Sequence, residues 1–504
     1  MKLRGSSGTV CRSRVCRVAV RLHAASLLCT ILSLGAATAI LSGCVTPKAP
    51  AARFTVDEPI DETGGLIPDL EHRTFEFFWA TANPKNGLVP DRYPAPSFAS
   101  IAAVGFALTA YPIGVERGYV TRAAARDRVL ATLRFFRDAP QGPVPVGMSG
   151  YKGFYYHFLD MNTGVRYGSR TELSMIDTSL LIAGMLVCET YFDGRDAGEA
   201  EIRQIADTLY RRVDWTWASR DDGEIALGWT PEFGFHPRSW RGYNEAMVLY
   251  VLALGSPGKP IPETAWQSYV STNQFHWDGP PDEQYLSFPP LFGHQYSHVW
   301  IDFRDIRDAF MREKRMDYFE NTRRAIYAQQ RYAIANPMHW KDYGAQMWGI
   351  TASDGPADVK LPYGGETRAF HSYAARGLGG PQTYDDGTLA PNAIAGSLPF
   401  APELALPALK HMKEQYGEYL YSTYGFLDAF DPSFDYDVPL WGGRRIPGVG
   451  WFDTNYLGID QGLTLAMIEN YRSGLIWRIM RHNPAVRRGL ERAGFKGGWL
   501  ETAN

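Results

Sequence analysis

Apolar residues recur at helical spacing through most of this chain, and this periodicity constrains its fold more than any other feature. Three long examples come early, at residues 66–82, 97–118 and 121–139, and Thr121 stands at a capping position of the third. About a dozen helices cannot bury their apolar faces in one bundle, whereas two concentric rings of antiparallel helices can. Further helices are predicted at about 171–193, 198–218, 239–254, 294–314, 318–335, 400–418 and 459–472.

The predicted fold is therefore an all-α barrel, a toroid with an inner and an outer ring of helices. The stretches "MIDTSLLIAGMLV" and "GYNEAMVLYVLALG" are apolar nearly all round, as helices of an inner ring must be. Long loops rich in Gly, Pro, Trp and Tyr join the helices, and the "DMNTG" turn within residues 146–168 predicts a small β-hairpin. An α-solenoid is the alternative, but the sequence has no fixed period to support it.

The first 43 residues have the pattern of an export signal. They contain six basic residues and no acidic one, followed by an apolar run from about Ala24 to Leu41. The run ends in Leu41-Ser42-Gly43-Cys44, which resembles a lipoprotein processing site that leaves a lipid on Cys44. We expect a signal peptide at 1–43, a tether at 44–64 and a globular domain at 65–504, anchored by lipid in the periplasm, at the outer membrane. A plain signal peptide or a single membrane anchor is the alternative.

Removal of residues 1–43 would change the charge of the protein. The whole chain has 51 basic and 54 acidic residues, and without the six basic residues of the signal the net charge is about −9. Such a charge argues against nucleic acid as a partner. Cys188 would be the only cysteine besides Cys44, so no disulfide framework is expected.

Several acidic residues lie at or near the starts of the apolar helices, where the mouth of a barrel would bring them together. A carboxylate is costly to bury as an ion, so each of these residues is paired, capped or kept for function. Taken singly each is more simply structural, but the set favours a shared site. Two carboxyl groups on either side of a glycosidic bond are what sugar hydrolysis requires. The set is Glu172, Asp177, Glu232, Glu245, Asp302, Asp460 and Glu469.

Aromatic residues number 68, and many fall in the predicted loops. Flat rings beside hydrogen-bonding groups suit the faces and hydroxyl edges of pyranose sugars. Packing of long loops onto the barrel is the simpler explanation for any single ring, but together the rings predict a carbohydrate cleft. Those expected to bind substrate are Tyr155, Trp229, Trp240, Tyr243 and Trp348.

Two histidines and an aspartate share one helical face in "LFGHQYSHVWIDFRD": His294, His298 and Asp302. Gln295 stands where a zinc protease needs its glutamate, so that mechanism is excluded. The three residues could still hold a metal. We favour instead a polar stripe that lines the barrel, donates hydrogen bonds to sugar hydroxyls and orients carboxylates, and we expect no metal or cofactor.

Long strings spread over residues 66–500 closely resemble the bacterial glycoamylase-like domain family, which includes the endo-β-1,2-glucanases of glycoside hydrolase family 144. The resemblance implies an (α/α)6 barrel and an exported enzyme that hydrolyses β-1,2-glucan, endo-acting and inverting, without a cofactor. The strings include "NGLVPDRYP", "ELSMIDTSLLIAGML", "WRGYNEAMVLYVLALGSP", "TASDGPADV", "YGFLDAFDPSF" and "YLGIDQGLTLAMIENYRSG".

The resemblance also implies catalytic residues. The acidic positions of the family match Glu172, Asp177 and Glu245, with Glu245 as the proton donor or its close supporter. The string "YGSRTELS" departs from the family, which often carries an acidic residue where Ser169 or Arg170 stands. The alternatives are a glucoamylase or transglycosylase acting on another glucan linkage, and a noncatalytic envelope lipoprotein that binds glucan.

Overall fold

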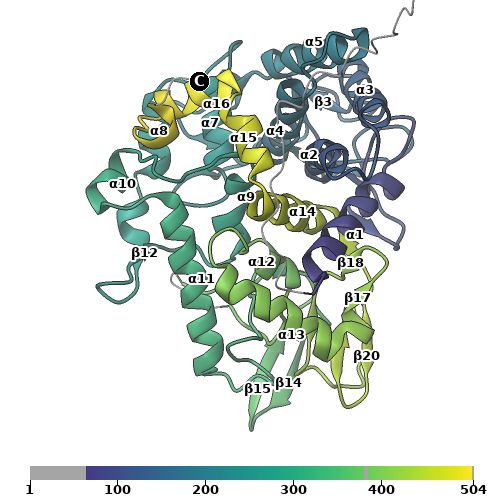
Figure 1. The fold of residues 1–504 in the computed structure, drawn as a ribbon, viewed down its shortest axis with the longest axis vertical. Coiled ribbons are helices and arrows are strands. Elements are labelled where there is room, and N and C mark those ends of the chain that lie inside the picture. Colours follow the sequence, from purple (N-terminus) through teal and green to yellow (C-terminus); the bar gives the residue numbers. More distant parts are fainter. Residues whose placement is uncertain (1–63, 380–383, 502–504) are drawn as a thin grey trace, which may run out of the picture. The chain divides into compact units, whose positions relative to one another are not determined.

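The computed structural model describes residues 64–379 and 384–501, which belong to one compact unit (Figure 1). The predicted signal peptide, Cys44 and all of the tether except Gly64 lie outside the described residues. Within the described residues, none of the helices has both the length and the apolar character needed to cross a membrane.

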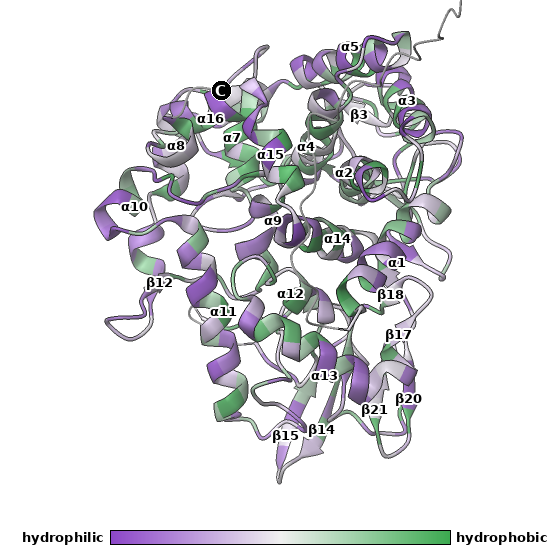
Figure 2. Ribbon diagram, viewed as in Figure 1, coloured by the Kyte–Doolittle hydropathy of each residue, from purple (hydrophilic) through white to green (hydrophobic). Residues whose placement is uncertain are grey.

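The described chain is mainly helical, and six of its helices are buried on nearly every side. The sequences of α2, α4 and α7 are apolar nearly all round rather than along one stripe, and Figure 2 shows α2 and α7 largely in the colour of hydrophobic residues, whereas α9 and α14 also bury polar side chains. The buried helices are α2 (Ile101–Glu116), α4 (Met175–Tyr191), α7 (Met247–Gly255), α9 (Phe292–Trp300), α12 (Pro391–Ala395) and α14 (Gly458–Arg472).

The other helices bury one face, and most of them expose charged residues on the opposite face. Their stripes of apolar residues pack on the buried helices, and α11 and α13 alternate between the two colours of Figure 2. These helices are α1 (Leu66–Thr81), α3 (Arg122–Asp138), α5 (Ala197–Arg212), α6 (Trp215–Ala218), α8 (Thr264–Val270), α10 (Ala309–Lys314), α11 (Tyr318–Ala335), α13 (Pro402–Leu420), α15 (Leu475–Arg481) and α16 (Pro484–Arg492), with 3-10 turns η1 (Asn273–His276) and η2 (Gly498–Leu500).

Contacts between the buried helices form a closed sequence. Helix α2 packs on α4, α4 on α7, α7 on α9, α9 on α14, and α14 back on α2, while α12 packs on α14. The helices of the second group cover this ring from outside: α1 packs on α14 and α2, α3 on α2, α5 on α4, α11 on α9 and α13 on α12.

Short antiparallel strands occupy the loops between the helices. They hold the loop ends together, and the longest pair, β14 with β15, projects away from the helices in Figure 1. The sheets are β1 (Arg92–Tyr93) with β22 (Tyr456–Leu457), β2 (Ala99–Ser100) with β5 (Phe158–Leu159), β3 (Gly150–Tyr151) with β4 (Phe154–Tyr155), β6 (Leu173–Ser174) with β8 (Gly228–Thr230) and β9 (Gly234–Phe235), β7 (Ile225–Ala226) with β10 (Ser239–Trp240), β11 (Trp277–Asp278) with β12 (Tyr285–Leu286), β13 (Ala352–Ser353) with β16 (Ala374–Ala375), β14 (Val359–Tyr363) with β15 (Glu366–Phe370), β17 (Tyr421–Ser422) with β18 (Gly425–Phe426), and β19 (Phe430–Asp431) with β21 (Gly450–Phe452) and β20 (Arg444–Ile446).

Two predicted helices are shorter than the periodicity indicated. The helix predicted at 239–254 begins only at Met247, because Ser239 and Trp240 pair with β7. The helix predicted at 294–314 ends at Trp300 and resumes as α10, so Asp302 is not on the helical face that carries His294 and His298. The "DMNTG" turn does reverse the chain, but the ladder around it is a single bridge between Leu159 and Arg166.

Helices α2 and α4 approach each other through two glycines. A Cβ added to Gly184 would lie 2.1 Å from the carbonyl oxygen of Gly105, and one added to Gly105 would lie 2.3 Å from the carbonyl oxygen of Leu180. Backbone atoms on both sides cannot move without separating the helices. The ring of buried helices therefore depends on the absence of side chains at this crossing.

We expect Gly184→Ala to lower the free energy of unfolding by about 1–3 kcal/mol, because the added methyl group overpacks the crossing. Chemical denaturation measures the change. Gly417→Ala in α13 is the matched control: its Cβ meets the nearest atom, Lys413 Cγ, at 3.4 Å, so it should stabilise by about 0.5–1 kcal/mol. Equal stability of Gly184→Ala and the wild type would contradict the inferred crossing.

Candidate active site

A cavity of about 860 Å³ opens where the N-terminal ends of several buried helices meet the short strands. Asp177 lies in the first turn of α4, Glu245 two residues before α7, and Asp460 in the first turn of α14. All three line the cavity, together with Glu172 from the chain before β6 and Asp91 before β1. The structure thus brings the three predicted catalytic carboxyls, Glu172, Asp177 and Glu245, to one cavity.

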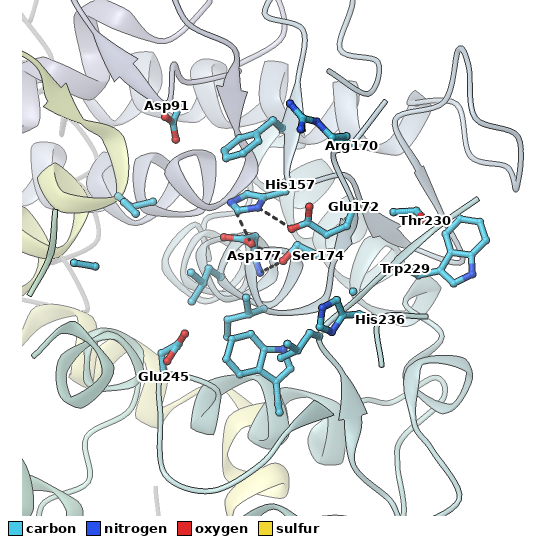
Figure 3. Close-up of a pocket in the computed structure, with 18 of the residues that line it drawn as sticks. Asp91, His157, Arg170, Glu172, Ser174, Asp177, Trp229, Thr230, His236 and Glu245 are labelled. Carbon is cyan, nitrogen blue, oxygen red and sulfur yellow. Dashed lines mark hydrogen bonds and ion pairs between the residues drawn. The ribbon is translucent and has the colours of Figure 1, made fainter. Parts of the chain in front are cut away.

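Two of these carboxyls are joined by a histidine (Figure 3). His157 Nδ1 lies 3.0 Å from Glu172 Oε1, and its Nε2 lies 3.4 Å from Asp177 Oδ2. Burial would lower the pKa of His157, but Asp177 and the hydrogen bond to Glu172 outweigh it and raise the pKa to about 9. Burial would raise the pKa of Glu172, but the hydrogen bond from His157 outweighs it and leaves that pKa below its usual value. Near neutral pH this side of the cavity holds an ionised Glu172 beside an imidazolium.

Glu245 has a different environment. Burial raises its pKa to about 7, and the negative charge of Asp177 adds to the shift. Its Oε2 has no hydrogen-bond partner among the described residues, and in Figure 3 its carboxyl points into the space it shares with Asp177. A substantial fraction of Glu245 is therefore protonated near neutral pH, with one oxygen available to a ligand.

Helix α9 fixes the backbone around Glu245. Ser297 Oγ donates a 2.8 Å hydrogen bond to the carbonyl oxygen of Glu245 and accepts one of 3.0 Å from the backbone N–H of Val248. His294 Nδ1 accepts a hydrogen bond of 3.0 Å from the hydroxyl of Tyr243, since its Nε2–H donates to the carbonyl oxygen of Phe288. The polar side chains of α9 therefore hold the segment that carries Glu245.

Aromatic side chains form part of the cavity wall. Pairing of β6 with β8 sets Leu173 opposite Trp229, which brings Trp229 beside Glu172. Phe233, at the turn between β8 and β9, is 90% exposed although it lines the cavity. Trp240 also lines the cavity, and its indole nitrogen has no hydrogen-bond partner among the described residues. Rings that are partly or fully exposed in a cavity are suited to the face of a sugar ring.

The predicted polar stripe on α9 requires correction. His294 and His298 are buried in the core and do not line the cavity, and burial lowers the pKa of each to about 3. Asp302 lies beyond the end of α9, where Arg304 holds it at 2.7 Å. Burial would raise the pKa of Asp302, but Arg304 outweighs it and lowers that pKa. These three residues neither contact a sugar in the cavity nor form a shared metal site.

The other predicted site residues also include some that line the cavity and some that do not. Of the aromatic residues expected to bind substrate, Trp229 and Trp240 line the cavity, whereas Tyr155, Tyr243 and Trp348 are buried in the core. Of the wider acidic set, Glu232 pairs with Arg166 at 2.7 Å, and Glu469 pairs with Arg117 at 2.7 Å near the C-terminal end of α14.

Sequence reasoning missed His157 and Asp91. The backbone N–H of His157 donates to the carbonyl oxygen of Glu172 at 2.9 Å, so strand pairing sets the two side chains together. No helical periodicity could have revealed this, because both residues lie outside helices. Asp91 does fall within the string "NGLVPDRYP", one of the strings that carry the family resemblance. Arg170, at the position where the string "YGSRTELS" departs from the family, also lines the cavity.

Comparison with known proteins agrees with the resemblance. Residues 237–484 match the family model named Glycoamylase, whose members are described as glucoamylases. The matched segment is similar to this family. Over 463 residues it is 26% identical to the exo β-1,2-glucooligosaccharide sophorohydrolase (non-reducing end) of Parabacteroides distasonis, covering 85% of this chain. The chain spans 57% of the length of that relative.

Solved structures similar to this chain include two glucanases. The endo-β-1,2-glucanase of Chitinophaga pinensis, in complex with sophorotriose and glucose, has a TM-score of 0.74 at 26% identity, with 87% of this chain and 99% of that one covered. The β-1,2-glucanase of Parabacteroides distasonis has a TM-score of 0.71 at 25% identity, with 86% and 60% covered.

We expect His157→Gln to change how the stability of the protein depends on pH. Because the pKa of His157 is raised from 6.5 to about 9, its contribution is complete below pH 6.5 and is lost as the pH rises through 9. The stability difference between wild type and His157→Gln should therefore shrink over this window in denaturant titrations. A difference that stays constant across this pH range would refute the raised pKa of His157.

Proposed function

We propose that the protein is a glycoside hydrolase that cleaves β-1,2-glucan in this cavity. The observation that carries the proposal is the meeting of Glu172, Asp177 and Glu245 at one aromatic-lined cavity. Similarity to β-1,2-glucan-degrading enzymes, 26% in identity with the sophorohydrolase and with the Chitinophaga pinensis glucanase, supports this substrate. The proposed domain that carries the activity spans residues 65–504.

We further propose that the helices form an (α/α)6 barrel. One or two of the ten one-sided helices stand between each buried helix and the next along the chain, which is the alternating order that two concentric rings require. The closed sequence of contacts among α2, α4, α7, α9 and α14, with α12 packed on α14, supports this arrangement. The cavity would then lie at the end of the barrel where the inner helices begin.

In the proposed reaction Glu245 donates the proton to the leaving glycosidic oxygen or supports that donation. A general acid works best when its pKa lies near the operating pH, and the pKa of Glu245 is raised to about 7. Glu172, with its lowered pKa, stays ionised and can accept a proton or orient a water. Asp177 is held against Ser174, so it orients His157 or activates water.

We expect Glu245→Gln to lower kcat on linear β-1,2-glucan by about 10²–10⁴-fold with a small change in KM, because the amide cannot supply the proton. In the wild type kcat should fall as the pH rises above 7, where Glu245 loses its proton. Reducing-end assays across pH measure both effects.

Glu189→Gln is the matched control for Glu245→Gln. Burial also raises the pKa of Glu189 to about 7, but Glu189 lies near the end of α4 and does not line the cavity. The Glu189→Gln variant should keep the wild-type kcat and the same fall in kcat above pH 7. A wild-type kcat in Glu245→Gln would remove Glu245 from the mechanism, and a wild type that binds the glucan without cleaving it would favour a binding protein.

Starch tests the linkage, because a glucoamylase would release glucose from starch and leave β-1,2-glucan intact. We expect products from β-1,2-glucan alone. NMR of the first products should show the α-anomer if the β-linkage is cleaved with inversion, and oligosaccharides of several lengths if the cut is internal. Initial β-anomer would contradict inversion.

We also propose that the protein is exported and held at the outer membrane by a lipid on Cys44. The basic residues, apolar run and Cys44 in the first 44 residues support this proposal. Expression in a bacterial host with labelled palmitate should label the wild type and not Cys44→Ser. The Cys44→Ser variant should also be absent from the membrane fraction. Labelling of Cys44→Ser would contradict the anchor.

A further inference from the structure

Three aspartates from separate loops meet behind the cavity, in a group we call the Asp triad: Asp354, Asp428 and Asp453. Each is buried, and one oxygen from each lies within 4.8 Å of the others. Asp354 follows β13, Asp428 lies between β18 and β19, and Asp453 follows β21. The triad does not line the cavity.

Each carboxylate of the Asp triad is held through one oxygen only. Arg92 Nη1 donates to Asp354 Oδ2 at 2.7 Å, and the backbone N–H of Asp354 donates to Asp428 Oδ2 at 2.8 Å. Asp453 Oδ1 accepts from the backbone N–H groups of Thr454 and Asn455. The second oxygens, Asp354 Oδ1, Asp428 Oδ1 and Asp453 Oδ2, are buried without any hydrogen-bond partner in the described chain.

The charge of the Asp triad is not balanced by protein groups. Within the described part of the chain, Arg92 is the one cation that forms an ion pair with a member of the Asp triad, and its partner there is Asp354. Arg92 also lies 3.6 Å from Asp91. Arg376 is close by, but its guanidinium is held by both oxygens of Asp386, at 2.6 and 2.9 Å. When all three are ionised, the carboxylates leave two negative charges that Arg92 does not balance, and Asp460 lies beside Asp428. Such charge is costly in a buried site, so burial raises the pKa of each carboxyl.

We propose that the Asp triad binds a hard divalent cation, of the class of Ca²⁺ and Mg²⁺. Both ions prefer oxygen ligands, and carboxylates are the main protein ligands of each. Oxygen ligands on opposite sides of Ca²⁺ lie about 4.6–5.2 Å apart, so a group within 4.8 Å can surround one ion. The two positive charges equal the uncompensated negative charge.

The cation would act on structure rather than on the reaction. It would tie together three loops, one of which continues through β22 into α14 and carries Asp460 to the cavity wall. Arg92, which also lines the cavity, contacts the Asp triad from the other side. This role does not depend on the proposed hydrolase activity, so each can fail without the other.

The test uses the protein without its predicted signal peptide, residues 1–43, after treatment with EDTA and dialysis. Titration with CaCl₂ and, separately, MgCl₂ should raise Tm by about 2 °C or more with at least one ion. Calorimetry or elemental analysis after gel filtration should give about one bound cation per chain. No rise in Tm and no bound cation with either ion would overturn the proposal and favour carboxyls that share protons.

Asp453→Asn is the decisive variant. It keeps the oxygen that accepts from Thr454 and Asn455, but it removes one charged ligand, so cation binding should weaken at least about tenfold. In EDTA its Tm should exceed that of the wild type, because one buried like charge is gone. A general structural role for Asp453 would instead lower Tm in EDTA and in Ca²⁺ alike, which would overturn the proposal.

Asp431→Asn is the matched control. Asp431 is buried, its Oδ1 accepts from two backbone N–H groups, and its Oδ2 has no partner among the described residues, but it lies outside the Asp triad. It should keep the full response to the cation, and loss of that response would overturn the assignment. If Asp453→Asn does not fold, Asp428→Asn takes its place, and the wild-type stoichiometry decides the question independently.

Discussion

The structure depends on helices that are buried on nearly every side and that pack on one another in a closed sequence. Charged residues are few along α2, α4 and α7, and several acidic side chains lie where the buried helices begin. Asp177 and Asp460 occupy first turns, and Glu245 precedes its helix by two residues. At these positions free backbone N–H groups and the helix dipole favour a negative charge. The cavity is the place where these N-terminal ends meet.

Within the cavity, neighbouring groups give the carboxyls different properties. His157 joins Glu172 and Asp177 and keeps Glu172 ionised, whereas Glu245 is desolvated and holds its proton to higher pH. Glu172 and Glu245 thereby differ in pKa, which is the division that the proposed acid–base hydrolysis of a glycoside requires. The aromatic wall contributed by Trp229, Phe233 and Trp240 offers surfaces for the sugar itself.

The polar residues His294 and Ser297 of α9 support the fold around Glu245 and do not line the cavity. His294 is neutral in the core and supports Tyr243, two residues before Glu245, and Ser297 binds the backbone of Glu245 directly. These residues therefore position the active-site segment without lining the cavity. The Asp triad has a similar place in the fold, because it joins loops that lead to the cavity wall.

Local periodicity and strings shared with a family were enough to predict the helical class, the apolar character of α4 and α7, and Glu172, Asp177 and Glu245 as candidate catalytic residues. Which polar residues face the cavity depends instead on contacts between distant segments. His157 contacts Glu172 because of strand pairing, and the Asp triad is formed by loops about 25–100 residues apart. No local sequence pattern could therefore predict the His157–Glu172 contact or the Asp triad. His294 and His298 have a spacing suited to function, yet the packing of α9 between α7, α11 and α14 turns both into the core. A helical period fixes which residues share a face, but the neighbours of that face are set by contacts between distant segments.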